Sequence, residues 1–168
     1  MQSSPVFRVR STAFGAGRPK ICIPLTSPDQ TTLEQDLQTL QGLPHDLVEW
    51  RADCFGLHRD KAALRHALQT LRDALGETPL LFTFRTKAEG GSASLDFASY
   101  ASLNREAASS GLVDLVDVEL FSADREDVKL LVSMLQTRGV GVVVSTHDFE
   151  KTPSAEEITR RLLLAKEL

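Results

Sequence analysis

The sequence predicts an α/β fold in which parallel strands alternate with helices that cover them. Three observations predict it. Short apolar runs suited to buried strands recur along the chain. Each run is followed by a segment whose apolar residues recur at three- and four-residue spacing, which places them on one face of a helix. Strand and helix alternate in order, and this order requires parallel strands joined by right-handed crossovers.

The strands are predicted from short runs that are mainly apolar, so we expect both faces of each strand to be covered. The predicted strands are Ile21–Leu25, Leu47–Trp50, Leu80–Phe84, Leu115–Val118 and Val140–Val144.

The helices are predicted from one-sided apolar stripes and from the residues that start and stop them. Ser27–Gln30 and Ser154–Glu157 are predicted capping boxes before the first and last helices. Gly76, Gly111 and Gly139 lie where the second, third and fourth helices are expected to end. The apolar stripes are Leu33, Leu37 and Leu40; Leu64, Leu68, Leu71 and Leu75; Phe97, Tyr100, Ala101 and Leu103; Val128, Leu131, Val132 and Leu135; and Ile158, Leu162 and Ala165.

The N-terminal segment stands outside this repeat. Apolar and basic residues alternate between Val6 and Arg10, and small turn residues follow. This pattern predicts a β-hairpin packed across the amino-terminal mouth of the sheet, with a disordered leader over residues 1–4. We therefore divide the chain into a leader and hairpin, residues 1–19, and a single α/β domain, residues 20–168.

Two architectures fit the order of strands and helices. A doubly wound nucleotide fold normally has a glycine-rich turn after its first strand, but here Pro24–Pro28 follows. In a (β/α)₈ barrel, reactive groups come from the ends of several strands. We favour the barrel, of which this chain holds about the first five βα units. Its last residue falls where a sixth strand would be expected.

Composition narrows the functional classes. A net charge of −4 over 168 residues gives no electrostatic case for binding nucleic acid or an anionic membrane. No apolar run approaches the roughly 18 residues that a membrane span needs, so we expect a cytoplasmic protein. Cys22 and Cys54 lack the spacing of metal ligands, which argues against a zinc site.

Charged residues cluster where the predicted strands end. Glu49, Arg51 and Asp53 alternate, so they share one face of the second strand, while Trp50 points toward the helices. Such a face lines the mouth of a barrel; in an edge strand it would instead face solvent. Arg85 follows the third strand and is expected to enter the same mouth.

The guanidinium groups of Arg51 and Arg85 beside Glu49 suit a small, anionic, polyhydroxylated ligand. Arg85 could equally belong to an ion-pair network with Glu49 or Asp53. Asp117 and Glu119 alternate at the end of the fourth strand and are expected to orient a neighbouring side chain.

His147 is the only histidine placed at the end of a predicted strand. Imidazole titrates near neutrality and is the commonest general acid and base in enzymes. A structural hydrogen-bonding role remains the alternative on this evidence.

Four short motifs lie in order at these strand ends. They are Glu49–Asp53; Phe82–Arg85 with Glu89–Gly91; Asp117–Leu120; and Ser145–Phe149. Together they resemble the motifs of type I 3-dehydroquinate dehydratase, an enzyme of the shikimate pathway of aromatic amino-acid biosynthesis. The similarity runs from about Pro19 to the end of the chain.

The resemblance implies a (β/α)₈ barrel, usually a homodimer, with no metal or organic cofactor. The reaction it implies is a lyase step, loss of water from 3-dehydroquinate to give 3-dehydroshikimate through a lysine Schiff base. His147 matches the family's catalytic acid and base, and Glu89 matches the glutamate that supports it. Glu49, Arg51 and Arg85 match residues that hold the hydroxyls of the substrate.

Two features depart from the family pattern. Pro24 stands where many relatives have a serine that contacts substrate. The Schiff-base lysine of the family lies on the sixth strand, and Lys87, Lys151 and Lys166 do not match its position. We therefore expect the 168-residue chain to be incomplete for catalysis. The alternatives are an inactive half-barrel that serves binding or assembly, and another Schiff-base barrel enzyme resembling class I aldolases.

Overall fold

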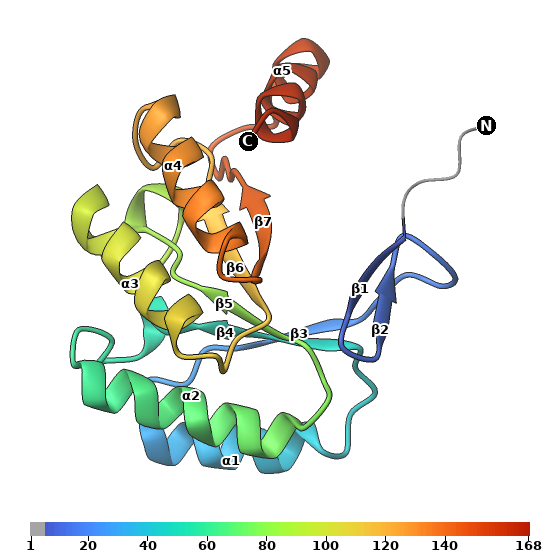
Figure 1. The fold of residues 1–168 in the computed structure, drawn as a ribbon, viewed down its shortest axis with the longest axis vertical. Helices are drawn as coiled ribbons and strands as arrows, with labels where there is room; N and C mark the ends of the chain where they lie inside the picture. Colours follow the sequence, from blue (N-terminus) through green and yellow to red (C-terminus); the bar gives the residue numbers. More distant parts are fainter. Residues whose placement is uncertain (1–5) are drawn as a thin grey trace.

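The computed structural model describes residues 6–168 and shows one curved sheet of parallel strands with helices along its outer side (Figure 1). The leader predicted for residues 1–4 lies outside the described residues. Strands neighbour one another in chain order, as expected for consecutive βα units. The strands of the sheet are β3 (Cys22–Leu25), β4 (Leu47–Arg51), β5 (Leu80–Thr83), β6 (Leu115–Glu119) and β7 (Gly141–Ser145). Each predicted strand is present, with its ends shifted by no more than one residue.

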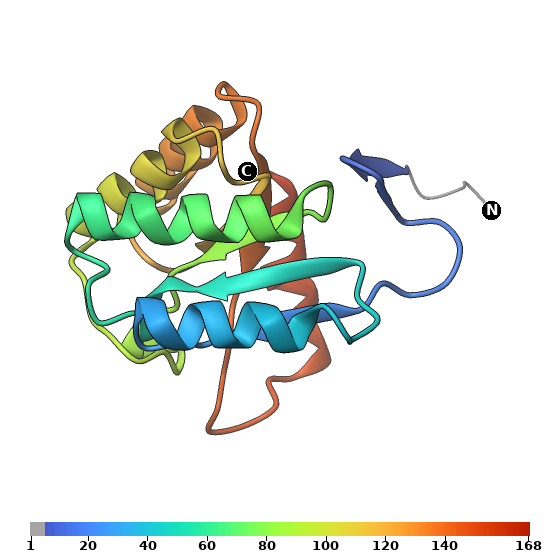
Figure 2. The ribbon, with the colours of Figure 1, turned by 90° about the horizontal axis from the view of Figure 1, so that it is seen from below.

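A helix follows each of these strands, and α1 to α4 cover one side of the sheet (Figures 1 and 2). Two short 3₁₀ helices, η1 (Ala52–Cys54) and η2 (Lys87–Glu89), follow β4 and β5 directly. The α-helices are α1 (Gln30–Leu40), α2 (Lys61–Leu75), α3 (Phe97–Ser109), α4 (Arg125–Gln136) and α5 (Ala155–Lys166).

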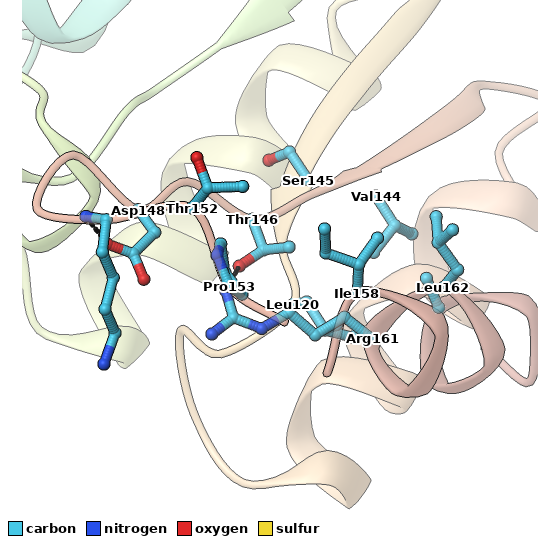
Figure 3. A pocket seen from close by; sticks show the side chains of 12 residues that line it. Leu120, Val144, Ser145, Thr146, Asp148, Thr152, Pro153, Ile158, Arg161 and Leu162 are labelled. Atoms are coloured by element: carbon cyan, nitrogen blue, oxygen red, sulfur yellow. Dashed lines mark hydrogen bonds between the residues drawn. The ribbon is translucent and has the colours of Figure 1, made fainter. Parts of the chain in front are cut away.

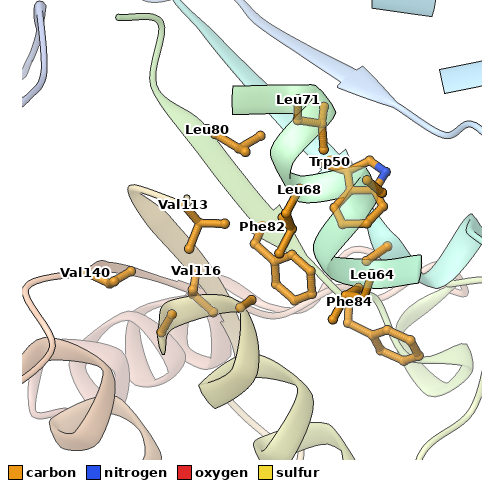
Figure 4. Close-up of a cluster of buried hydrophobic side chains, with 14 of the residues drawn as sticks. Trp50, Leu64, Leu68, Leu71, Leu80, Phe82, Phe84, Val113, Val116 and Val140 are labelled. Carbon is orange, nitrogen blue, oxygen red and sulfur yellow. The ribbon is translucent and has the colours of Figure 1, made fainter. Parts of the chain in front are cut away.

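The main core lies between the sheet and these helices (Figure 4). Trp50 of β4 and Phe82 of β5 are fully buried there, against Leu68 of α2 and its neighbours. The two rings meet edge to face, with centroids 5.8 Å apart. Burying a large apolar side chain contributes roughly 1.5–3 kcal/mol. The prediction that Trp50 points toward the helices is confirmed, so the alternate residues of β4 face the opposite side.

The helix starts agree with the sequence at α5 but not at α1. The side chain of Ser154 accepts the backbone N–H of Glu157, as predicted. At α1, however, the predicted cap Ser27 is wrong. Asp29 caps this helix by accepting the N–H of Thr32 at 2.8 Å, because it lies directly before the first helical residue. Ser27 instead donates to Asp36.

The predicted hairpin is present and lies at the amino-terminal ends of the strands. It consists of β1 (Phe7–Val9) and β2 (Thr12–Phe14), which pair antiparallel. Val9 packs against Leu47, Leu81 and Leu115, the side chains that face away from the helices. The hairpin therefore closes the amino end of the sheet and leaves the carboxyl ends of the strands open.

The last strand and helix of the chain are less covered than the rest. Within residues 6–168, β3 and β7 are the edge strands of the sheet. No residue of α5 is buried, and Leu162 on this helix is 67% exposed. No helix among the described residues is long and apolar enough to cross a membrane.

Candidate active site at the carboxyl ends of the strands

The parallel register brings the polar strand ends together at one edge of the sheet. Arg51 of β4 lies beside Thr83 of β5, and Glu119 of β6 lies beside Ser145 of β7. Because the strands run parallel, the segments that leave them also meet at this edge. The residues singled out from the sequence are therefore neighbours in space.

Arg85 is the centre of this cluster. Its guanidinium is almost fully buried and reaches across two strands. Nη2 lies 2.9 Å from Asp117, and Nη1 donates to Glu119 at 3.1 Å and to the hydroxyl of Ser145 at 2.8 Å. Nη1 also lies 3.6 Å from Glu89. The ion-pair network that was one alternative for Arg85 is present, but its partners are these carboxylates rather than Glu49 or Asp53.

The charges of this network do not balance. One guanidinium faces three carboxylates, those of Glu89, Asp117 and Glu119. Burial disfavours the charged guanidinium, but Asp117 and Glu119 outweigh this effect and hold the pKa of Arg85 above its ordinary value. Burial raises the pKa of Asp117 despite Arg85, and the nearby charge of Glu49 adds to the rise. The site is therefore acidic around one fixed cation.

The hydroxyl of Tyr100 holds the end of β6 from behind. It accepts the backbone N–H of Glu119 at 3.0 Å and donates to the carbonyl of Asp117 at 3.3 Å. Glu119 in turn accepts the backbone N–H and the hydroxyl of Thr86, each at 2.7 Å. The sequence placed Tyr100 on the apolar face of its helix and gave no sign of this role. Asp117 and Glu119 orient Arg85 and Thr86.

Glu89 and His147 form a contact between the loop after β5 and the end of β7. One oxygen of Glu89, Oε2, accepts the backbone N–H of His147 at 3.0 Å and lies 3.0 Å from Nδ1 of its ring. A carboxylate only accepts hydrogen bonds, so in the neutral form of the ring the hydrogen sits on Nδ1 and Nε2 keeps its lone pair. The imidazole is 37% exposed and stacks on Phe149. This arrangement prepares Nε2 to take a proton.

The two glycines after Glu89 are required by close contacts. Gly90 has a left-handed φ of +83°, and a Cβ there would lie 2.2 Å from the ring of Phe149. A Cβ on Gly91 would lie 1.9 Å from the carbonyl oxygen of Arg85. The loop can bring Glu89 under His147 because both positions lack a side chain.

We expect Gly91→Ala to destabilise the protein by about 1–3 kcal/mol, because a backbone oxygen must move to admit the methyl group. Gly42→Ala is the matched control, since a Cβ there meets its nearest atom at 3.7 Å. Urea unfolding of both variants measures the difference. Equal stabilities would show that the loop accommodates a side chain at Gly91.

Arg51 is held by Asp53 rather than by a strand partner. Nε and Nη2 of Arg51 each donate to Asp53 at 2.8 Å, a bidentate pair. Asp53 itself is buried in η1, beyond the end of β4, so the prediction that it shares a strand face with Glu49 and Arg51 is wrong. Glu49 and Arg51 remain half-buried on the side away from the helices. Among residues 6–168, no group of three or more His, Cys, Asp or Glu is arranged to hold a metal ion.

A groove of about 360 Å³ adjoins the cluster at Ser145, between β7 and α5 (Figure 3). Leu120, Val144, Ile158 and Leu162 give it an apolar part, and Lys151 and Arg161 also line it. The polar cluster around Arg85 holds the charged residues singled out from the sequence, and it is the candidate site.

The comparisons with known proteins agree with this geometry. Residues 21–168 match the family described as type I 3-dehydroquinase. The chain is 45% identical to a 3-dehydroquinate dehydratase of Bacillus licheniformis over 161 residues, which is 96% of this chain and 63% of that protein. It is 44% identical over 154 residues to one of Listeria monocytogenes, covering 92% of this chain and 61% of the relative.

The chain belongs to the type I 3-dehydroquinase family. The crystal structure of a type I 3-dehydroquinate dehydratase from Clostridium difficile matches 98% of this chain and 65% of that one, with a TM-score of 0.94 at 36% identity. The enzyme of Geobacillus kaustophilus matches 98% and 64%, with a TM-score of 0.92 at 32% identity. The predicted family and the partial (β/α)₈ barrel are thus confirmed. The chain spans somewhat less than two thirds of the length of these relatives.

Proposed function

We propose that the protein dehydrates 3-dehydroquinate to 3-dehydroshikimate, with the strand-end cluster as its substrate site. The observation that carries the proposal is the contact of Glu89 with His147 beside the Arg85 network, in a chain of the type I 3-dehydroquinase family. A general base must lie within reach of the proton that it removes, and imidazole held at one nitrogen by a carboxylate meets this need at the other.

The chemistry explains why these groups are wanted together. A ketone that condenses with a lysine amine becomes an iminium, which withdraws electrons from the neighbouring carbon. His147 then takes the proton from that carbon and becomes positively charged. In this form it gives a proton to the departing hydroxyl, which leaves as water. Glu49, Arg51 and Arg85 hold the hydroxyls of the substrate. The acidic surroundings of Arg85 favour a positive charge on the reacting nitrogen.

The lysine that this reaction needs belongs, by the family resemblance, to the sixth strand of the barrel. Lys87 lies in η2, Lys151 in the loop before α5, and Lys166 at the end of α5. On the same resemblance we propose that the complete protein is a homodimer. We also propose that it acts in the cytoplasm.

The proposal is tested with 3-dehydroquinate on two proteins: the product of the full reading frame and the 168-residue chain. Formation of the conjugated product is followed by ultraviolet absorbance, and borohydride is added to reduce any Schiff base before mass spectrometry. We expect conversion and one reduced adduct for the full product, and no adduct on the 168-residue chain. An adduct on the short chain would contradict the lysine assignment. No conversion by the full product would refute the function and favour an inactive binding module.

A further inference from the structure

Asp53 contacts several parts of the candidate site, although no role in the reaction has been given to it so far. Its side chain is fully buried, so it does not reach a substrate. Both of its oxygens are used. Oδ1 accepts from Nε of Arg51 at 2.8 Å and from the backbone N–H of Arg85 at 3.2 Å. Oδ2 accepts from Nη2 of Arg51 at 2.8 Å and from the backbone N–H of Ser92 at 2.9 Å.

The two backbone partners of Asp53 lie on either side of η2 in the connection between β5 and α3. Arg85 precedes η2 and Ser92 follows it, and Glu89 lies between them. The loop is also closed on itself, since the N–H of Gly91 donates to Thr86 at 2.8 Å and that of Lys87 to Ala93 at 2.9 Å. One carboxylate therefore clamps the base of the loop that carries the glutamate under His147.

The charge of Asp53 is part of this clamp. Burial would raise its pKa, but the hydrogen bonds from Arg51 and from the backbone N–H of Ser92 outweigh burial, and its pKa lies below the ordinary value. Asp53 is thus ionised at neutral pH. Each of its oxygens accepts two hydrogen bonds from N–H groups, and Oδ2 also accepts a weak one from the thiol of Cys54. An asparagine keeps one oxygen, but an NH₂ group takes the place of the other. This group cannot accept a hydrogen bond from the N–H donors that it would face.

We propose that Asp53 is a positioning residue of the dehydration reaction, which fixes the guanidinium of Arg51 through its Nε and Nη2 and holds the loop of Glu89 beneath His147. The inference rests on the proposed function, because it concerns the same site. It assigns to one buried side chain the alignment of two groups with different tasks, substrate binding through Arg51 and proton transfer through His147.

The test compares Asp53→Asn with Asp114→Asn. Asp114 is a clamp of the same kind at the opposite, amino-terminal end of the sheet. It pairs with Arg10 and Arg72 and accepts the N–H of Leu80 at 2.9 Å.

In the active full-length protein, far below the unfolding temperature, we expect Asp53→Asn to lower kcat/KM by about 10- to 100-fold. Both KM and kcat change, and the pH profile of kcat moves because the partner of His147 is displaced. We expect the Asp114→Asn variant to have a lower thermal stability but unchanged kcat, KM and pH profile.

A readout without activity separates this inference from the proposed function. In NMR spectra of the 168-residue chain, Asp53→Asn should shift the Nε–Hε signal of Arg51 and the amide signals of Glu89 and His147, whereas Asp114→Asn leaves all three in place. Unmoved signals of Glu89 and His147, or unchanged kinetics in a destabilised Asp53→Asn protein, would overturn the positioning role. Inactivity of the unmutated protein would refute the function and leave the NMR result to decide on the clamp.

Discussion

Replacing Arg85 with methionine is expected to lower the free energy of unfolding by about 3–5 kcal/mol at pH 7, because it leaves buried carboxylates without their cation. Asp117 and Glu119 both lie within 3.1 Å of its guanidinium, and both are almost fully buried. Methionine keeps the unbranched stem of arginine and lacks its guanidinium, so the substitution removes the charge and its hydrogen bonds. Urea unfolding measures it, with Lys129→Met on the exposed face of α4 as the control.

The same variant has a predictable pH dependence. The pKa of Asp117 is already raised by burial, and removal of Arg85 removes what opposes that rise. A carboxyl group whose folded pKa exceeds its unfolded value favours folding below the unfolded value, and this contribution is lost as pH rises through the folded pKa. The deficit of Arg85→Met should therefore be smaller near pH 4.5 than at pH 7. An equal deficit at both pH values would show that Arg85 does not balance these carboxylates.

Replacing His147 with alanine is expected to lower kcat of the complete protein by roughly 10²–10⁴-fold, the usual contribution of a positioned general acid or base. Its ring is partly exposed and fixed through Nδ1 by Glu89, so the substitution removes the proton acceptor without opening the core. Stability should change little. Steady-state kinetics with 3-dehydroquinate measures the effect.

His66→Ala is the matched control for this variant, since His66 lies exposed on α2, away from the strand ends. If His147→Ala and His66→Ala retain the same kcat, the proton is moved by another group. A loss of borohydride-trapped adduct in His147→Ala, with full stability, would instead point to a role before proton transfer, in forming the Schiff base.

Much of the fold could be predicted because its signals are local. The run from Leu80 to Phe84 is apolar except at Thr83, and such a run is typical of a strand covered on both sides. The alternation at Glu49, Trp50 and Arg51 gave the correct faces because side chains alternate along a strand. The first helix cap was missed because Ser27 and Asp29 are both suitable caps, and only the path of the chain selects one.

The contacts of the site were harder to predict than its residues. That Arg85, Glu89 and His147 share one edge follows from parallel strands, but the partners of Arg85 depend on the register of β5, β6 and β7. The hydroxyl of Tyr100 reaches β6 through helix packing, and Asp53 reaches two backbone N–H groups through the fold of a loop. Neither contact leaves a pattern in the spacing of residues.

The central claim is that the side chains at the carboxyl ends of the strands form one site for 3-dehydroquinate. An NMR titration of the ¹⁵N-labelled 168-residue chain with this compound tests it most directly, with cyclohexanecarboxylate as the control ligand without hydroxyls. We predict concerted shifts of the signals of Arg51, Arg85, Glu89 and His147 with 3-dehydroquinate alone. Shifts confined to the hairpin or to the groove between β7 and α5, or none up to the solubility of the ligand, would contradict it.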